Sequence, residues 1–120
     1  MSTQQVATRL AELCRQGKFE AAQKELFADD AVSIEQHESP ESPKETKGLR
    51  NIIEKGHKWS ETVEQMHSCT VSQPLIAGNA FAVTLGIDVT MKGRGRMHLE
   101  EVCVYEVNKE GKIESEQFFM

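Results

Sequence analysis

Apolar and polar residues alternate most regularly in the second half of the chain, between Asn79 and Val107. From Phe81 to Met91 every second residue is apolar, and the residues between them are small or polar. This period of two is typical of a β-strand that buries one face. Residues 92–96 hold two glycines and two arginines, which favour a turn. The pattern therefore predicts that a second strand, Met97 to Val107, folds back against the first.

The register of this hairpin decides which side chains share its buried face. A five-residue turn places Met91 opposite Met97 and Ile87 opposite Glu101. One carboxylate, Glu101, then interrupts a face that otherwise holds Met97, Leu99, Cys103, Tyr105 and Val107. A slip of one residue would instead bring His98, Glu100, Val102, Val104 and Glu106 to that face. We favour the first register because it gathers more apolar surface.

Helical spacing and turn residues predict the other elements. Apolar residues at intervals of three and four predict helices from Ser2 or Thr3 to Gly17, from Phe19 to Asp29 and Asp30, and from Gly48 to about Val63. Alternation predicts further strands at 31–36, 66–73 and 112–120, the last reached through the turn Asn108–Gly111. Between the first strand and the third helix, residues 37–47 include Pro40, Glu41 and Pro43 and are expected to be a solvated loop. A lid over a pocket is the less favoured interpretation of this loop.

This order of elements predicts an α+β fold, with helices on one face of an antiparallel sheet. At 120 residues the chain is expected to form a single domain, residues 1–120. An apolar fraction of 38% is low and fits a sheet with one face open to water. Three short helices cannot cover a long curled sheet completely, so a pocket is expected on its concave side.

Composition and charge narrow the expected partners. The net charge is −5, and lysines and arginines form no large cluster, so nucleic acid is not expected as a partner. The sequence shows no signal-peptide pattern and no long apolar run, which favours a soluble, cytoplasmic protein away from membranes. Cys14, Cys69 and Cys103 lie far apart and fit free thiols in a reducing compartment. Neither cysteines nor histidines have metal-ligand spacing, and no phosphate or nucleotide motif occurs, so no metal or cofactor is expected.

Three segments carry a resemblance to a known family. They are LFADDAVSIE (Leu26–Glu35), the helix that opens at Gly48, and VYEVNKEGKIESEQFF (Val104–Phe119). In this order they resemble the SnoaL-like branch of the nuclear transport factor 2-like superfamily, which includes ketosteroid isomerase and the polyketide cyclases. The resemblance covers essentially the whole chain. It implies a cone-shaped fold in which three N-terminal helices pack on a strongly curved, mixed but mainly antiparallel sheet that encloses a pocket.

The comparison with ketosteroid isomerase carries over position by position. Glu35 falls where that enzyme has its catalytic aspartate base. Cys103 falls where it has a protonated aspartate donor, and Leu10 falls at or next to its oxyanion tyrosine. Because a leucine cannot donate a proton to an enolate oxygen, steroid isomerisation is not expected.

Two further carboxylates are candidate catalytic groups. If Val107 pairs with Lys112, Cys103 lies opposite Glu116, and Glu101 lies opposite a phenylalanine. The concave face then holds Glu101, Cys103, Tyr105, Glu116, Phe118 and Met120. Two carboxylates among apolar walls should repel each other and raise at least one pKa, which suits general acid–base chemistry near neutral pH. Alternatively, Glu116 pairs with a lysine or arginine, or is exposed.

Several other residues are candidates for binding a ligand. We expect Glu35 to act as the base with His37 and His67 as partners, because an imidazole titrates in the useful range. Trp59 could stack on a ligand ring, with Tyr105 and Phe118 as further walls, although such a tryptophan is more often part of a core. The remaining lining candidates are Cys103, which fits a small buried hydrophobe better than a nucleophile, and Met120.

Two functions fit these expectations. The first is binding of a small hydrophobic molecule, with cofactor-independent acid–base chemistry of the isomerase, cyclase or dehydratase type by Glu35, Glu101 and Glu116. The second is a non-catalytic module that binds a ligand or a protein. In either case the outer sheet face is expected to form a homodimer, through Thr84, Asp88, Glu100, Val102 and Val104.

Overall fold

The structure of the protein, a computed structural model, describes residues 1–40 and 42–120. Glu41, which belongs to the predicted loop, lies outside the described residues. The described residues form three helices, α1 (Thr3–Arg15), α2 (Phe19–Leu26) and α3 (Leu49–Thr62). They also form seven strands, β1 (Phe27–Ile34), β2 (Glu45–Lys47), β3 (Val63–Val71), β4 (Leu75–Ala77), β5 (Ala80–Met91), β6 (Gly95–Val107) and β7 (Ile113–Phe119).

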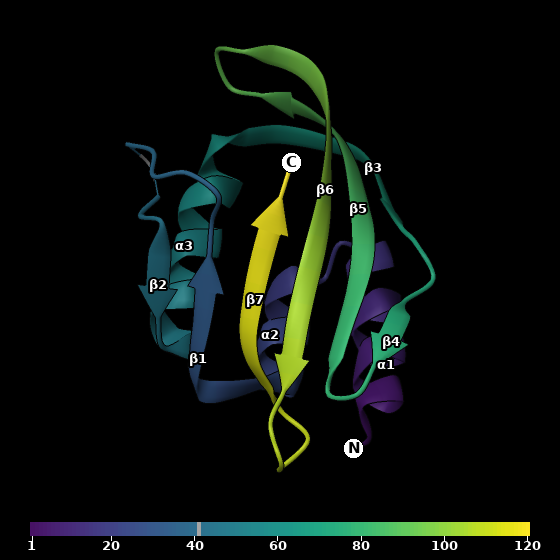
Figure 1. The fold of residues 1–120 in the computed structure, drawn as a ribbon. Helices are drawn as coiled ribbons and strands as arrows, with labels where there is room; N and C mark the ends of the chain where they lie inside the picture. The colour runs from purple at the N-terminus through teal and green to yellow at the C-terminus, as the bar shows by residue number, and fades with distance from the viewer. Residues whose placement is uncertain (41) are drawn as a thin grey trace.

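The strands make one sheet in the order β2-β1-β7-β6-β5-β3, and β4 pairs with β5 beside this path. Strands β1 and β7 run parallel, and the other pairs in the described part of the chain are antiparallel. All three helices lie on one side of the curved sheet (Figure 1). The predicted α+β fold, with three helices on a mixed, mainly antiparallel sheet, is confirmed. We call the side that faces the helices the inner face and the opposite side the outer face.

The N-terminal helix begins and ends where the sequence predicts. Ser2 caps it, because its hydroxyl accepts from the backbone N–H of Gln5 while the Gln5 side chain accepts from the N–H of Ser2. Gly17 follows with a φ of 73°, a conformation that glycine adopts without strain.

The second helix ends earlier than predicted. Strand β1 already begins at Phe27, so the expected helical end at Asp29 and Asp30 is wrong. Phe27 pairs with Ile113 of β7, and its ring lies edge-on to Tyr105 at 6.5 Å between centroids. Burial of this ring in the core holds the segment extended and outweighs its helical spacing.

Two short strands were not predicted. Strand β2 occupies the end of the expected loop and pairs with β1, which places Thr46 opposite Ser33. Strand β4 pairs with the start of β5. Each is three residues long, which is too short to show an alternating pattern.

The predicted pairing within the long hairpin is wrong by two residues. The turn comprises Lys92–Arg94, so Met91 lies opposite Gly95 and Leu85 lies opposite Glu101. Gly93 and Gly95 both have positive φ, which allows a turn shorter than the expected five residues. Because strand side chains alternate with a period of two, a shift of two residues keeps each side chain on the same face. The predicted set of inner-face residues is therefore retained, including Glu101.

The last hairpin shows a similar displacement. Its turn, Asn108–Gly111, is where the sequence predicts it, but Val107 pairs with Ile113 instead of Lys112. A bulge after Glu106 then brings Tyr105 opposite Glu116, and Cys103 opposite Phe118. The predicted partners of Cys103 and Glu101 across this hairpin are therefore wrong.

The core lies between the inner face and the helices. Phe81 of β5 and Tyr105 of β6 stack with ring centroids 4.9 Å apart. The helices contribute buried apolar residues that include Val6, Leu10, Leu26 and Ile52. Among the described helices, none is long and apolar enough to cross a membrane.

Candidate functional site

A row of five buried side chains crosses the inner face of the sheet. The register of neighbouring strands places them in the order Thr46, Ser33, Glu116, Tyr105 and Phe81. The three on β2, β1 and β7 are polar or acidic, and the two on β6 and β5 are aromatic. All five are buried, and only 4% of Glu116 is exposed. A carboxylic acid thus lies at the boundary between a polar and an apolar part of the core.

Lys55 of α3 reaches this boundary from the helix layer. Its Nζ donates to the hydroxyl of Ser33 at 2.7 Å and to Oε2 of Glu35 at 3.0 Å. The same Nζ lies 5.6 Å from the ring centroid of Phe118, close enough for a cation–π contact. The lysine side chain is 17% exposed and that of Glu35 is 31% exposed. The pair is therefore only partly open to water.

Glu101 enters the same region from β6. It is half-buried, and the thiol of Cys103 lies 3.8 Å from its Oε1, as a weak donor. The negative charge of Glu35 and the positive charge of Lys55 both act on Glu101. The end of β1, helix α3 and strands β6 and β7 thus bring Glu35, Lys55, Glu101 and Glu116 together. We call these four residues and Ser33 the inner-face cluster.

Burial determines how the two inner acids titrate. It raises the pKa of Glu116 to about 7, and hydrogen bonding from Ser33 and the charge of Lys55 oppose this rise. Burial also raises the pKa of Glu101 to about 7, with a further contribution from the charge of Glu35. The pKa of two carboxyl groups of the cluster is therefore raised, with burial as the largest cause at both.

The thiol and phenol beside the cluster remain protonated at neutral pH. Burial, assisted by the nearby carboxylates, raises the pKa of Cys103 and of Tyr105 well above their ordinary values. A thiol is a nucleophile only as a thiolate, so Cys103 serves here as a small buried side chain. Tyr105 packs between Phe27 and Phe81 in the core.

The other candidate residues are spread over the molecule. Trp59 is half-buried on α3 and packs against the core, and Phe118 lies beneath Lys55. His37 is exposed, and Met120 is 73% exposed with its N–H bonded to Gln36. His67 lies on β3, where its Nε2 is 2.7 Å from the hydroxyl of Thr90. The structure thus gathers Glu35, Glu101 and Glu116 with Cys103 and Phe118, and it does not bring His37, His67 or Met120 into that group.

Sequence reasoning missed Lys55 and Ser33. A signal for Lys55 is present, since it lies three residues after Ile52 and four before Trp59, on the apolar side of its helix. A charged residue at such a position needs a buried partner. Ser33 gives no comparable signal, because serine in an alternating strand is usually solvated.

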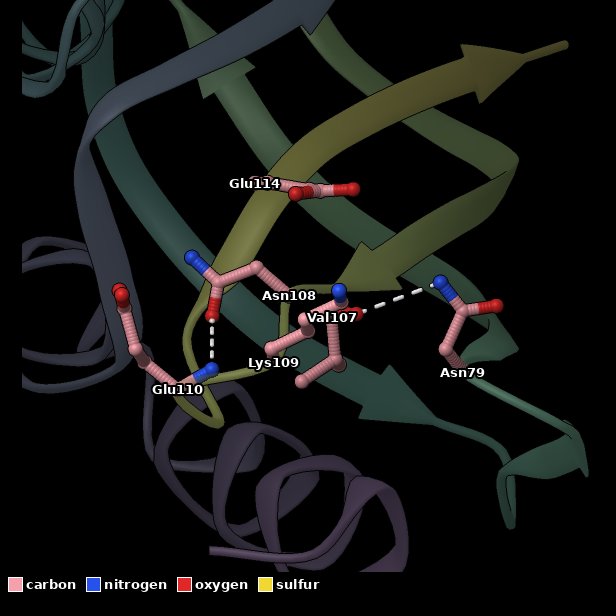
Figure 2. A pocket seen from close by; sticks show the side chains of 6 residues that line it. All are labelled: Asn79, Val107, Asn108, Lys109, Glu110 and Glu114. Carbon is pink, nitrogen blue, oxygen red and sulfur yellow. Dashed lines mark hydrogen bonds between the residues drawn. The ribbon is translucent and has the colours of Figure 1, made fainter.

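Two surface hollows lie apart from this cluster. One, of about 520 Å³, is lined by Asn79 and by residues around the turn between β6 and β7 (Figure 2). There the Asn79 amide donates to the carbonyl of Val107 at 3.3 Å, and the N–H of Glu110 donates to the Asn108 side chain at 3.0 Å. The other, of about 640 Å³, lies along the N-terminal helix between Met1 and Glu12. The pocket expected on the concave side stays a prediction.

Metal binding receives no support from the arrangement of ligand-type side chains. Within residues 1–40 and 42–120, no three histidine, cysteine, aspartate or glutamate side chains are grouped so that they could hold a metal ion.

Comparison with known proteins places this geometry in a family. The family model described as SnoaL-like domain matches residues 1–120. No curated protein matches the chain at a significant level. Among solved structures, a candidate SnoaL-like polyketide cyclase from Mesorhizobium loti is 32% identical over 100% of both chains, with a TM-score of 0.91.

More distant structures share the fold. A nuclear transport factor 2-like protein of unknown function from Burkholderia pseudomallei is 15% identical, with a TM-score of 0.82 over 100% of this chain and 92% of that one. A Mycobacterium tuberculosis protein in complex with estradiol-17β-hemisuccinate is 20% identical, with a TM-score of 0.72 over 100% of this chain and 95% of that one. The match along the whole sequence, together with the helices on the inner face of the sheet, shows that the chain belongs to the SnoaL-like domain family.

Proposed function

We propose that the inner-face cluster performs acid–base chemistry on a small hydrophobic molecule, as a cofactor-independent isomerase, cyclase or dehydratase. The observation that carries this proposal is the convergence of Glu35, Glu101 and Glu116 on one lysine, beside aromatic side chains. General acid–base catalysis needs groups that both hold and release a proton at the working pH. A pKa of about 7 for Glu101 and for Glu116 meets this requirement.

The three carboxyl groups take different roles in this proposal. Glu35 is ion-paired and partly exposed, so it is the base that removes a proton from the ligand. Glu101, which is half-buried on β6, donates a proton to the ligand. Glu116 is buried and lies opposite Ser33, and it holds a proton in reserve. Phe118 and Trp59, which are partly buried, form the apolar contacts of the ligand.

The relatives support this class of ligand. The Mesorhizobium loti structure is named for a SnoaL-like polyketide cyclase and also for a carbohydrate phosphatase, and the Mycobacterium tuberculosis structure contains estradiol-17β-hemisuccinate. The proposal follows the polyketide cyclase name and the estradiol ligand, and it extends this ligand class to the present chain.

Hydrogen–deuterium exchange at carbon tests the proposal directly. The protein would be incubated in D₂O with a panel of enolisable ketones and aromatic diketones, and deuterium uptake would be followed by NMR. We expect at least one compound to exchange on the order of 10²-fold faster than in buffer, the lower range for general acid–base catalysis. Glu35→Gln and Glu101→Gln should abolish this gain. Glu100→Gln is the matched control, since Glu100 is exposed on the same strand.

Two outcomes would contradict the proposal. One is exchange at the buffer rate for every compound that binds. The other is exchange in Glu35→Gln and Glu101→Gln that equals that of the unchanged protein. Binding without exchange would favour the non-catalytic alternative, a domain that holds a small molecule without converting it.

A homodimer through the outer sheet face is a second proposal, supported by exposed apolar side chains there. Val102 of β6 and Phe119 of β7 lie directly opposite each other and are 40% and 39% exposed. Apolar side chains that meet on an exposed sheet face favour association. Sedimentation at low micromolar concentration should detect a dimer, and Val102→Lys should dissociate it. A monomer at every concentration would contradict this proposal.

A cytoplasmic location is proposed from the cysteines. Cys14, Cys69 and Cys103 are free, which suits a reducing compartment. Protein taken from cells under denaturing conditions should react with a maleimide at all three thiols without prior reduction. A protein recovered with a disulfide would contradict this location.

A further inference from the structure

Lys55 connects two carboxyl groups that come from different strands. Its ammonium group donates directly to Glu35, which follows β1, and to the hydroxyl of Ser33 within β1. Ser33 is fully buried and lies opposite Glu116 on the neighbouring parallel strand. A hydroxyl that accepts from an ammonium group still has its own hydrogen to donate. Hydrogen bonding from Ser33 is one of the interactions that favour the ionised form of Glu116.

Several acidic groups surround Glu116, and the positive charge of Lys55 opposes theirs. Acidic or ionisable groups face this carboxyl from several elements: Glu35 beside β1, Glu101, Cys103 and Tyr105 on β6, and Cys14 on α1. Within the part of the chain that the structure describes, Lys55 is the cation whose charge acts on both Glu116 and Glu101. One positive charge therefore opposes three carboxyl groups.

We propose that Lys55 is a positioning residue for the three acids: it holds Glu35 in an ion pair, and it acts on Glu101 through its charge and on Glu116 through its charge and the Ser33 hydroxyl. This inference rests on the proposed function. Lys55 acts through the carboxyl groups: it contacts Glu35 directly and reaches Glu116 through the Ser33 hydroxyl.

In this proposal Lys55 affects Glu101 and Glu116 in two different ways, which an ion pair with a structural role alone would not do. The path to Glu101 is through space, so it depends on the positive charge alone. The path to Glu116 uses both the charge and the Ser33 hydrogen bond. Removal of the charge should therefore affect both acids, whereas removal of the Ser33 hydroxyl should affect Glu116 and leave Glu101 unchanged.

Carboxyl titration by carbon-13 NMR, in protein labelled at glutamate, tests these paths. In Lys55→Met, the titration midpoints of Glu101 and Glu116 should rise by about one pH unit, because the opposing charge is lost. Lys55→Arg keeps the positive charge, so both midpoints should stay close to those of the unchanged protein. In Ser33→Ala the midpoint of Glu116 alone should rise. Lys58→Met is the control, because it removes the same charge from an exposed position of the same helix.

Glu35→Gln gives a shift of opposite sign. The charge of Glu35 opposes ionisation of both other acids, so its removal should lower the midpoints of Glu101 and Glu116. If Lys55→Met does not fold, the proposal is still tested by Ser33→Ala, Lys55→Arg and Glu35→Gln. A structural role for Lys55 would alter stability without these opposed and residue-specific shifts.

The results distinguish failure of this inference from failure of the proposed function. Midpoints of Glu101 and Glu116 that stay the same in Lys55→Met would overturn the role of Lys55, even where both acids titrate near neutral pH. Equal shifts of both acids in Ser33→Ala would overturn the path through the hydroxyl. Midpoints in the ordinary glutamate range in the unchanged protein would count against the proposed function. Even then, midpoint shifts of the expected sign in the variants would support the positioning role of Lys55.

Discussion

Two charged clusters lie on opposite faces of the same sheet, and they affect their carboxyl groups in opposite directions. On the outer face, Arg96 donates two hydrogen bonds to Asp88, at 3.0 and 2.9 Å, and the arginine side chain is 63% exposed. The bond from Arg96 lowers the pKa of Asp88. On the inner face, Lys55 bonds Glu35, but burial raises the pKa of both Glu101 and Glu116. The charge of a nearby cation therefore does not by itself decide how an acid titrates.

Access to water explains the difference. At Asp88, whose side chain is 26% exposed, the hydrogen bond from Arg96 outweighs the cost of burial. At Glu116 the protein replaces the solvent with aromatic and thiol neighbours, and one lysine shared among three acids does not compensate. The helices that cover the inner face are thus what makes its acids different from those on the outer face.

Aromatic residues on the two faces should give the largest contrast in stability. Phe81→Ala removes a ring that is 2% exposed and stacked on Tyr105, so unfolding free energy should fall by about 3–5 kcal/mol. Phe119→Ala, on the outer face and 39% exposed, should cost less than about 1 kcal/mol. Urea unfolding of both variants, below the concentration at which sedimentation detects a dimer, measures the contrast, and equal losses would show that Phe119 is buried even in the monomer.

Glu116→Gln should remove a pH dependence that Asp88→Asn leaves intact. The folded-state pKa of Glu116 is raised to about 7, so its contribution to stability is present below the unfolded value of 4.5 and is lost as pH rises through 7. At about pH 8 the glutamine variant should be more stable than the unchanged protein by about 2–3 kcal/mol, with little difference at pH 4 to 5.

Asp88 has the opposite sign. Its folded-state pKa is lowered, so its contribution is present above the unfolded value and is lost as pH falls. Asp88→Asn should therefore have its effect above pH 4. Thermal unfolding between pH 3 and 9 measures both variants, and a Glu116→Gln curve parallel to that of the unchanged protein would refute the burial argument.

Loss of the cation should give a smaller contrast than loss of the buried acid. Lys55→Met leaves Ser33 and Glu35 without their donor in a partly buried site, and it should cost about 1–2 kcal/mol near neutral pH. Arg96→Met removes a pair whose arginine side chain is 63% exposed, which should cost less than about 1 kcal/mol in moderate salt. A larger loss in Arg96→Met would show that the outer pair stabilises the fold in a way that its exposure does not explain.

The fold was predictable because each of its long elements carries its own pattern. Alternation from Phe81 to Met91 and the glycine in the turn after Asn108 identified the hairpins, and in the first hairpin a shift of two residues left the side chains on their predicted faces. Phe27 was assigned wrongly because its extended conformation depends on distant contacts with Tyr105 and Ile113.

The candidate site was predictable only in part. Glu101 could be found because a carboxylate interrupts an otherwise apolar strand face, whereas Glu116 was placed on that face by a predicted hairpin pairing that is wrong in its partners. Lys55 and Ser33 could not be connected to them in advance, because the connection requires the parallel pairing of β1 with β7 and the position of α3 above that pair. Neither contact is visible in local spacing.

Residue-specific titration of Glu101, Glu116 and Asp88 by carbon-13 NMR in the unchanged protein is the most direct measurement. Opposite behaviour of the two faces predicts midpoints near 7 for both glutamates and a midpoint below the ordinary value for Asp88. Glutamates that titrate with midpoints near 4.5, beside an Asp88 that behaves as expected, would contradict the account, because the inner face would then be as open to water as the outer one.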